Sequence, residues 1–213
     1  MTETMIPSSA VRSAERAVEA RYSVYLDEAQ RLIQAGIDEI SEKGGVDPRV
    51  SDIVRRAGLS NKAFYRHFKS KEELLLAVLE EGMQRSRDDF DTHLASASTP
   101  LERVRTWILR VVELAIDAES ASATRPLLVY QATLAENLGP QVRGNVDRLM
   151  APLKQALCDA KAAGELPDID PARATDHVYF ATWGWVHGRI LAYVQPTRDE
   201  AEALADFILR GLR

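Results

Sequence analysis

The sequence predicts an all-α protein of about nine helices. Apolar residues recur every three or four positions along most of the chain, which is the spacing of helices with one buried face. The apolar–polar alternation typical of strands is absent, and the prolines and glycines fall between the periodic segments. The expected helices cover residues 24–43, 48–56, 60–67, 71–95, 100–118, 124–136, 140–163, 171–193 and 198–212.

The N-terminal segment, residues 1–23, is rich in small and polar residues, and we expect it to form a flexible arm. Its basic residues are Arg12, Arg16 and Arg21. Basic arms in other proteins contact the minor groove of DNA, although the acidic residues between these arginines offset part of the charge. The helix that follows carries an apolar stripe from Tyr25 to Ile40 and is expected to end at a pair of glycines, Gly44 and Gly45.

Two kinds of capping signal mark the later helix starts. An Asp-Pro pair places a capping carboxylate before a proline at the first helical position, and this pair occurs at residues 47–48 and 170–171. A Ser or Thr followed three residues later by Glu is a capping box, which occurs at Ser70, Thr99 and Thr197. These signals predict helices that begin at residues 48, 71, 100, 171 and 198.

The composition is that of an ordinary globular protein. No run of about 18 apolar residues predicts a membrane span, and the first residues lack the pattern of a signal peptide. The single cysteine, Cys158, excludes an internal disulfide bond and suits a reducing compartment. We therefore expect a cytoplasmic protein that has no contact with membranes.

The net charge of −5 is distributed unevenly. Between Arg49 and Lys71 the sequence has seven basic residues and one acidic residue, Asp52. A basic segment on an acidic body indicates contact with the phosphates of DNA. The alternative is a basic face that is simply solvated.

The basic segment also has the pattern of two short helices joined by a tight turn. Gly58 can end the first helix, because glycine adopts the left-handed conformation without strain. Ser60 can cap the second helix, and Phe64 and Phe68 lie four residues apart, so both can face the first helix. This is the layout of a helix-turn-helix, whose second helix reads DNA in the major groove.

The second helix of this pair carries the candidate DNA contacts. Its N-terminal end, where such helices meet base edges, consists of Asn61, Lys62 and Ala63. The polar residues outside the phenylalanine stripe are Tyr65, Arg66 and His67, which suit phosphates. The alternatives are a solvated Lys62, a Tyr65 that packs at the rim of the domain and a surface His67 at the helix end.

Four motifs resemble the signature of the TetR family of transcriptional regulators. They are Asp52-Ile53, Ala57-Gly58-Leu59-Ser60, Phe64-Tyr65-Arg66-His67-Phe68 and Ser70-Lys71-Glu72-Glu73-Leu74-Leu75. The resemblance covers about 50 residues and implies a homodimer with a DNA-binding domain at residues 24–70 and a ligand-binding and dimerisation domain at residues 71–213. It also implies phosphate contacts from Arg49, Tyr65, His67 and Lys71, with Asn61, Lys62 and Ala63 nearest the bases. Pro48 and Lys62-Ala63 depart from the family pattern, and the second departure puts the operator sequence in doubt.

Small residues follow one side of the helix expected at residues 171–193, and an apolar stripe follows the last helix. A close helix pair of this kind suits a four-helix seam between two protomers. The expected interface residues are Ala181, Gly184, Gly188, Leu204, Ile208 and Leu212. The alternative is that both stripes pack inside one protomer.

Aromatic and polar residues on three separate helices suit a pocket for a small, mostly apolar or amphipathic effector. The candidates are Trp107, Tyr130, Gln131, Tyr179, Trp183 and His187. The alternative is that the aromatic side chains fill the core and that His187 is a core histidine. Family resemblance implies that the effector releases the protein from DNA.

These features together predict a repressor that binds a palindromic double-stranded operator as a homodimer. An alternative is an adaptor whose C-terminal half binds proteins and no small molecule. Motifs for a metalloprotease, a phosphate-binding loop and a calcium site are absent, so we expect no enzyme, no metal ion and no cofactor.

Overall fold

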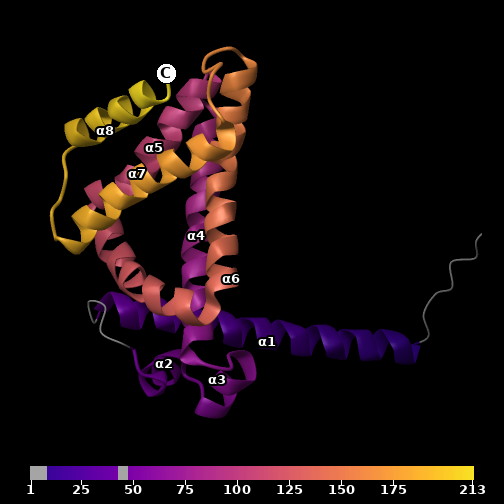
Figure 1. Ribbon diagram of the computed structural model, residues 1–213. Helices are drawn as coiled ribbons and strands as arrows, with labels where there is room; N and C mark the ends of the chain where they lie inside the picture. Colours follow the sequence, from indigo (N-terminus) through magenta and orange to yellow (C-terminus); the bar gives the residue numbers. More distant parts are fainter. Residues whose placement is uncertain (1–8, 43–47) are drawn as a thin grey trace, which may run out of the picture.

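The computed structural model describes residues 9–42 and 48–213, and all of its regular elements within these ranges are α-helices (Figure 1). They are α1 (Ser9–Glu42), α2 (Val50–Ala57), α3 (Asn61–His67), α4 (Lys71–Ala95), α5 (Pro100–Ile116), α6 (Ala118–Ala162), α7 (Pro171–Leu191) and α8 (Arg198–Gly211). The predicted all-α class is confirmed. Among the described residues, no helix is long and apolar enough to cross a membrane.

A small lobe is built from α1, α2, α3 and the first turns of α4. Figure 1 shows α2 and α3 on one side of the long α1, with α4 rising from the same place into the larger lobe. The core of the small lobe consists of Leu32, Ala35, Ile53, Val54, Ala57, Phe64, Phe68 and Leu74. The apolar positions singled out in the sequence therefore form one core, which includes the predicted phenylalanine pair.

The larger lobe surrounds α5, which packs against α6, α7 and α8. Its core includes Trp107, Ile108 and Val112 of α5, all fully buried. Arg105 on α5 forms ion pairs with Glu202 and Asp206, which hold α8 against α5.

A third apolar cluster joins the two lobes. It brings together Ile40 of α1, Leu75 and Leu79 of α4, and Leu134 and Val142 of α6. Because Leu74 also belongs to the core of the small lobe, α4 is shared by both lobes. The core of the small lobe thus extends past the expected boundary at residue 70.

The described part of the chain has a helix from Ser9 onward, where a flexible arm was expected up to residue 23. This segment is rich in alanine, glutamate and arginine, which have high helix propensity, although it lacks a core-facing stripe of its own. Residues 1–8 lie outside the described ranges, and so do Gly44, Gly45 and Asp47. Figure 1 shows the N-terminal half of α1 projecting away from the two lobes.

Two other expectations need correction. The helix expected at residue 48 begins at Val50, with Arg49 as an N-cap whose side chain makes no capping hydrogen bond, so Pro48 precedes the helix. The helices expected at 124–136 and 140–163 form one element, α6, which is kinked at Leu138 (φ −132°, ψ 33°). Pro140 lacks the N–H for a helical bond, and the non-helical backbone at Leu138 accommodates it.

Candidate nucleic-acid interface

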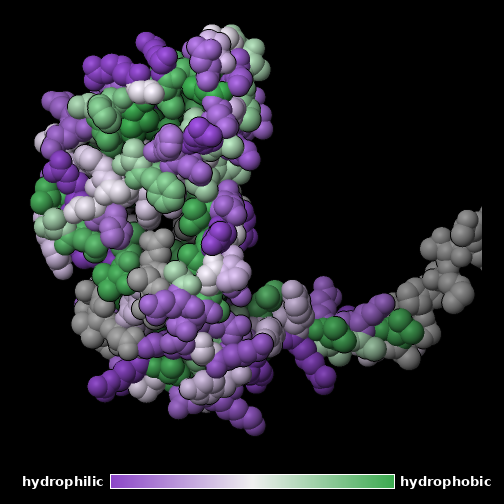
Figure 2. Space-filling view, viewed as in Figure 1, coloured by the Kyte–Doolittle hydropathy of each residue, from purple (hydrophilic) through white to green (hydrophobic). Residues whose placement is uncertain are grey.

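The outer face of α3 has the chemistry of a DNA-reading surface, because polar side chains cover it while its apolar side is buried. Asn61, Lys62, Tyr65 and Arg66 are exposed, and Tyr65 retains 61% of its accessible surface. Phe64 and Phe68 lie in the core of the small lobe. Figure 2 shows mostly hydrophilic side chains over the part of the molecule that contains α2 and α3. An exposed aromatic side chain between basic residues suits contact with a nucleic-acid backbone.

Local interactions fix the start of α3. Gly58 adopts the left-handed conformation (φ 64°, ψ 33°) after α2, as its position in the sequence predicts. The Ser60 hydroxyl oxygen then accepts a hydrogen bond from the backbone N–H of Ala63 at 3.2 Å. Arg31 of α1 donates to the carbonyl oxygen of Ala57, so α1 also braces the turn. The two short helices thus keep a defined angle to each other.

Two of the candidate DNA contacts face the protein interior. Ala63 is buried in the small lobe, so its side chain is not part of the exposed face. The side chain of His67 is only 1% exposed, and its Nε2 lies 2.8 Å from Oε2 of Glu28. Tyr25 covers the same imidazole, with 4.1 Å between the ring centroids. A phosphate contact from His67 is therefore not compatible with this arrangement.

Several of the basic residues between Arg49 and Lys71 are engaged in ion pairs. Arg55 pairs with Asp52 at 2.9 Å, and Arg66 pairs with Glu28. Arg56 binds Glu42 and Glu39, and these hydrogen bonds raise the pKa of its guanidinium above the usual range. The local excess of positive charge that reaches solvent is thus smaller than the count of basic residues indicates.

The exposed basic residues that remain are Arg49 before α2, Lys62 on α3 and Lys69 after α3. Lys71, at the first position of α4, is half-buried and already has an interaction partner. Along the sequence, these residues lie before, within and after the two short helices. Their side chains suit phosphates on either side of the groove that would receive α3.

Helix α1 contributes residues to this interface that the motif alone does not reveal. Glu28 accepts hydrogen bonds from His67 and Arg66, and these bonds lower the pKa of its carboxyl group. The hydroxyl of Tyr25 donates to the carbonyl oxygen of Arg66 at 3.3 Å. Tyr25 and Glu28 are three residues apart and therefore lie on one side of α1, a spacing that could have indicated a shared partner.

The candidate effector residues are divided between two clusters. Trp107 is fully buried, contacts Phe90 and donates from Nε1 to the carbonyl oxygen of Leu149 at 3.4 Å. Tyr179 and Trp183 stack with 6.3 Å between ring centroids, next to the same core.

The other candidate effector residues lie elsewhere. Tyr130 packs at the cluster that joins the lobes. The side chain of Gln131 lies outside the described ones, and His187 is half-buried.

This arrangement agrees with the alternative that the aromatic residues fill the core. Burial among apolar side chains raises the pKa of Tyr179 to about 12.

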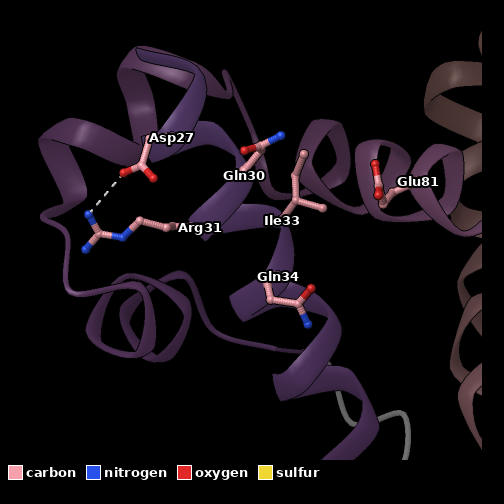
Figure 3. Close-up of a pocket in the computed structure, with 6 residues that line it drawn as sticks. All are labelled: Asp27, Gln30, Arg31, Ile33, Gln34 and Glu81. Atoms are coloured by element: carbon pink, nitrogen blue, oxygen red, sulfur yellow. Dashed lines mark ion pairs between the residues drawn. The ribbon is translucent and has the colours of Figure 1, made fainter. Parts of the chain in front are cut away.

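A groove of about 340 Å³ occurs elsewhere, between α1 and α4, and its lining is mostly polar (Figure 3). It is lined by Asp27, Gln30, Arg31, Ile33, Gln34 and Glu81. The aromatic set therefore does not line this groove.

The candidate dimer residues divide in a similar way. Ala181, Gly184 and Gly188 are exposed on α7, as an interface requires. Ile208 is buried in the core, and Leu204 and Leu212 pack against that core, because the apolar stripe of α8 faces α5 within the protomer. Leu204, Ile208 and Leu212 therefore pack inside one protomer, which was the alternative to an interface role.

The exposed faces of α7 and α8 carry two phenylalanines that were not singled out in the sequence. Phe180 is 68% exposed and Phe207 is 70% exposed. Both lie outside the stripes on which the sequence argument concentrated, so periodicity alone could not assign them to an interface. Within the described residues, no three His, Cys, Asp or Glu side chains gather closely enough to hold a metal ion.

Comparison with known proteins agrees with this geometry. Residues 32–78 match the model for "Bacterial regulatory proteins, tetR family". The chain is 35% identical over 77 residues to the HTH-type transcriptional regulator BetI of Rhizobium meliloti, which covers 36% of this chain and 38% of that protein. It is 30% identical over 142 residues to the HTH-type transcriptional regulator SrpR of Pseudomonas putida, which covers 65% and 63%. Each match thus spans less than two thirds of the relative.

Among solved structures, the transcriptional regulator FadR from Bacillus subtilis in complex with stearoyl-CoA superposes with a TM-score of 0.67. The superposition covers 86% of this chain and 96% of that chain, with 22% sequence identity. At this identity the likeness concerns the fold. It extends the agreement from the small lobe to the larger lobe.

Proposed function

Because the chain belongs to the TetR family of transcriptional regulators, we propose that it is a repressor that binds a palindromic DNA operator as a homodimer. The observation that carries this proposal is the outer face of α3, where Asn61, Lys62 and Tyr65 are exposed on a helix anchored by its phenylalanines. A short helix held in this way can enter the major groove with its N-terminal end toward the bases.

Within this proposal, Lys62 and Asn61 read base edges, while Ser60, Arg49, Tyr65 and Lys71 contact the backbone. Lysine can donate to the O6 and N7 atoms of guanine, and asparagine can pair with adenine. Backbone contacts position the protein on any sequence, whereas base contacts distinguish sequences. The departure from the family pattern at Lys62-Ala63 then gives this regulator its own operator.

The test begins with selection of preferred sites from a random pool of double-stranded DNA, followed by footprinting. We expect a palindrome whose half-sites lie about 10 base pairs apart, because two symmetric recognition helices must enter successive major grooves. A short asymmetric site, protected by one protomer, would contradict the dimer.

Substitution of Lys62 then tests the assignment of base contacts. Lys62→Ala should weaken the selected operator by roughly 1–3 kcal/mol and relax the preference at one position in each half-site. Lys154→Ala removes the same charge from an exposed site on α6 and serves as the matched control. An unchanged ranking of operator variants in Lys62→Ala would remove Lys62 from the set of base readers.

The effector part of the proposal places an apolar or amphipathic ligand in the larger lobe, against Trp183, which is half-buried and packs on the outside of the core that contains Tyr179. The solved FadR of Bacillus subtilis is in complex with stearoyl-CoA, which supports a ligand of this class in the same fold. Because α4 is shared by both lobes, a ligand that favours a different tilt of α4 must lower DNA affinity by the factor by which DNA lowers ligand affinity.

This coupling is tested by titration with long-chain acyl-coenzyme A, with tryptophan fluorescence and operator binding followed together. The expected result is a fluorescence change that accompanies operator release, and loss of both in Trp183→Ala. A fluorescence change at constant operator affinity would separate the ligand site from regulation.

A further inference from the structure

Glu28 of α1 contacts two consecutive residues at the C-terminal end of the recognition helix. Its Oε2 atom accepts a hydrogen bond from Nε2 of His67 at 2.8 Å and is also the partner of the Arg66 guanidinium. The carboxylate is 18% exposed, so it lies at the edge of the lobe and not in its centre. One acidic residue therefore both anchors α3 and pairs with an arginine on its outer face.

The surroundings of His67 determine which nitrogen of its imidazole meets the Glu28 carboxylate. Nδ1 of His67 is buried and has no hydrogen-bond partner among the described atoms, whereas Nε2 faces the carboxylate. An imidazole that donates through Nε2 and leaves Nδ1 as a bare acceptor fits both observations. Tyr25 covers the ring and also donates to the Arg66 carbonyl oxygen, so together with the two contacts of Glu28 the end of α3 is held from α1 at four points.

The position of Arg66 has a consequence for DNA binding. Its side chain is 50% exposed and neighbours Tyr65, yet its charge is matched by Glu28. Affinity for DNA of any sequence comes mainly from phosphate contacts by unpaired cations. A carboxylate beside the recognition helix weakens phosphate contacts on every DNA sequence. On the operator, base contacts add to the affinity and are not weakened, so the carboxylate lowers the affinity for other sequences by a larger share.

We propose that Glu28 is a specificity-determining positioning residue, which holds Arg66 against α1 and thereby limits binding to non-operator DNA. Specificity is the difference between two affinities, so a group that weakens the wrong complex more than the right one increases it. The proposal rests on the function proposed above, since it concerns the same helix. It assigns to α1 a part in discrimination that the helix-turn-helix motif does not contain.

The test compares wild type with Glu28→Gln, which keeps the size of the side chain and an oxygen that His67 can donate to but removes the charge. Affinities are measured for the selected operator and for a random duplex of equal length, across a range of salt concentrations. We expect Glu28→Gln to bind the random duplex about fivefold more tightly, with a salt slope steeper by about one, because Arg66 gains a phosphate. Operator affinity should rise less, so the ratio of the two affinities falls.

Asp38→Asn is the matched control, because Asp38 also lies on α1 and its carboxylate accepts a hydrogen bond from the neutral side chain of Gln34 at 2.8 Å, so the substitution frees no arginine. It should leave the salt slope and the affinity ratio at their wild-type values. In an Arg66→Ala background, Glu28→Gln should no longer steepen the slope. A change of equal size in Asp38→Asn or in the Arg66→Ala background would overturn the proposal.

A purely structural role for Glu28 gives a different result. Glu28→Gln would then weaken binding to operator and random DNA alike and lower the melting temperature, and this outcome also overturns the proposal. If Glu28→Gln does not fold, Arg66→Gln answers the same question: it should leave the salt slope for random DNA unchanged, whereas Arg49→Gln, at an exposed residue proposed to contact a phosphate, should reduce it by about one. Failure of the wild type to prefer any sequence would instead contradict the proposed function.

Discussion

Burial separates residues that the sequence presents as equivalent on α3. Tyr65, Arg66 and His67 are consecutive polar residues, and all three were predicted to reach DNA. Only the first two are exposed, because α1 extends over the third with Tyr25 and Glu28. The period of a short helix shows which residues share a face, but the long-range partner that covers a face depends on how α1 lies across α3. The buried Ala63 illustrates the same limit.

Tyr179 gives a residue-scale prediction for alkaline pH. Its phenol has a pKa of about 12 in the folded protein, whereas an unfolded tyrosine ionises near 10. Above about pH 10 the unfolded state therefore loses this proton first, and the free energy of unfolding falls as pH rises toward 12. The loss from this group should reach roughly 2 kcal/mol at the upper end.

The measurement is urea unfolding of wild type and Tyr179→Phe at about pH 8 and about pH 11. The variant should lose less stability between the two pH values than wild type, because it has no phenol to ionise at this site. Tyr193→Phe, which alters an exposed tyrosine, is the control. Equal losses in wild type and Tyr179→Phe would show that Tyr179 is not desolvated in solution.

At the scale of elements, helix starts with side-chain caps were predicted well. The expected helix at 71–95 has these limits in the structure, with the Ser70 hydroxyl as the cap acceptor, and Thr197 forms a complete capping box before α8. The extra length of α1 and the fusion of two helices into α6 were not predicted. In both segments the local helix propensity is moderate, so tertiary packing determines where the helix begins and ends.

The turn between α2 and α3 gives a prediction for an element boundary. Gly58→Ala should destabilise the protein by about 1–2 kcal/mol, because an L-residue is strained in the left-handed conformation. An added Cβ would also lie 3.0 Å from Nη2 of Arg31, whose guanidinium braces the turn. We therefore expect a loss of operator affinity as well.

Gly164→Ala is the matched control, because Gly164 has a similar φ of +74° but no atom within 4 Å of the added Cβ. It should cost about 1 kcal/mol, as strain alone predicts, and leave operator binding intact. Chemical denaturation and operator titration of both variants make the comparison. Equal operator affinity in the two variants would mean that the Arg31 brace has no part in presenting α3.

At the scale of the whole molecule, α7 and α8 leave large apolar side chains uncovered. Ala181, Gly184 and Gly188 are exposed on the same helix as Phe180, and Phe207 is exposed on α8. Exposed phenylalanines next to small residues suit close packing against a second copy. The sequence predicts an interface on these two helices, but the stripe of α8 that it assigned to the partner packs against the protomer's own α5.

Phe180→Asp and Phe207→Asp should each shift the protein from dimer to monomer in sedimentation equilibrium, because a charge replaces apolar contact at the seam. Loss of the dimer should also abolish tight binding to the palindrome while weak binding to a half-site remains. Val18→Asp, at an exposed apolar position on the projecting part of α1, is the control and should stay dimeric. Dimers of unchanged affinity in both phenylalanine variants would move the interface elsewhere.

The apolar cluster shared by α1, α4 and α6 sets a rule for exchanging DNA-binding heads between regulators. A chimera that takes only residues 1–70 from this chain would leave Leu74 behind and so remove it from the core of the small lobe. It would also lose Leu75 and Leu79, which meet Leu134 and Val142 of α6. A junction after Leu79 keeps the head intact, and the recipient must then supply apolar side chains of matching volume at the two α6 positions. Exchange of the small lobe between relatives should therefore give folded proteins more often with crossovers in α4 beyond Leu79 than with crossovers at residue 70.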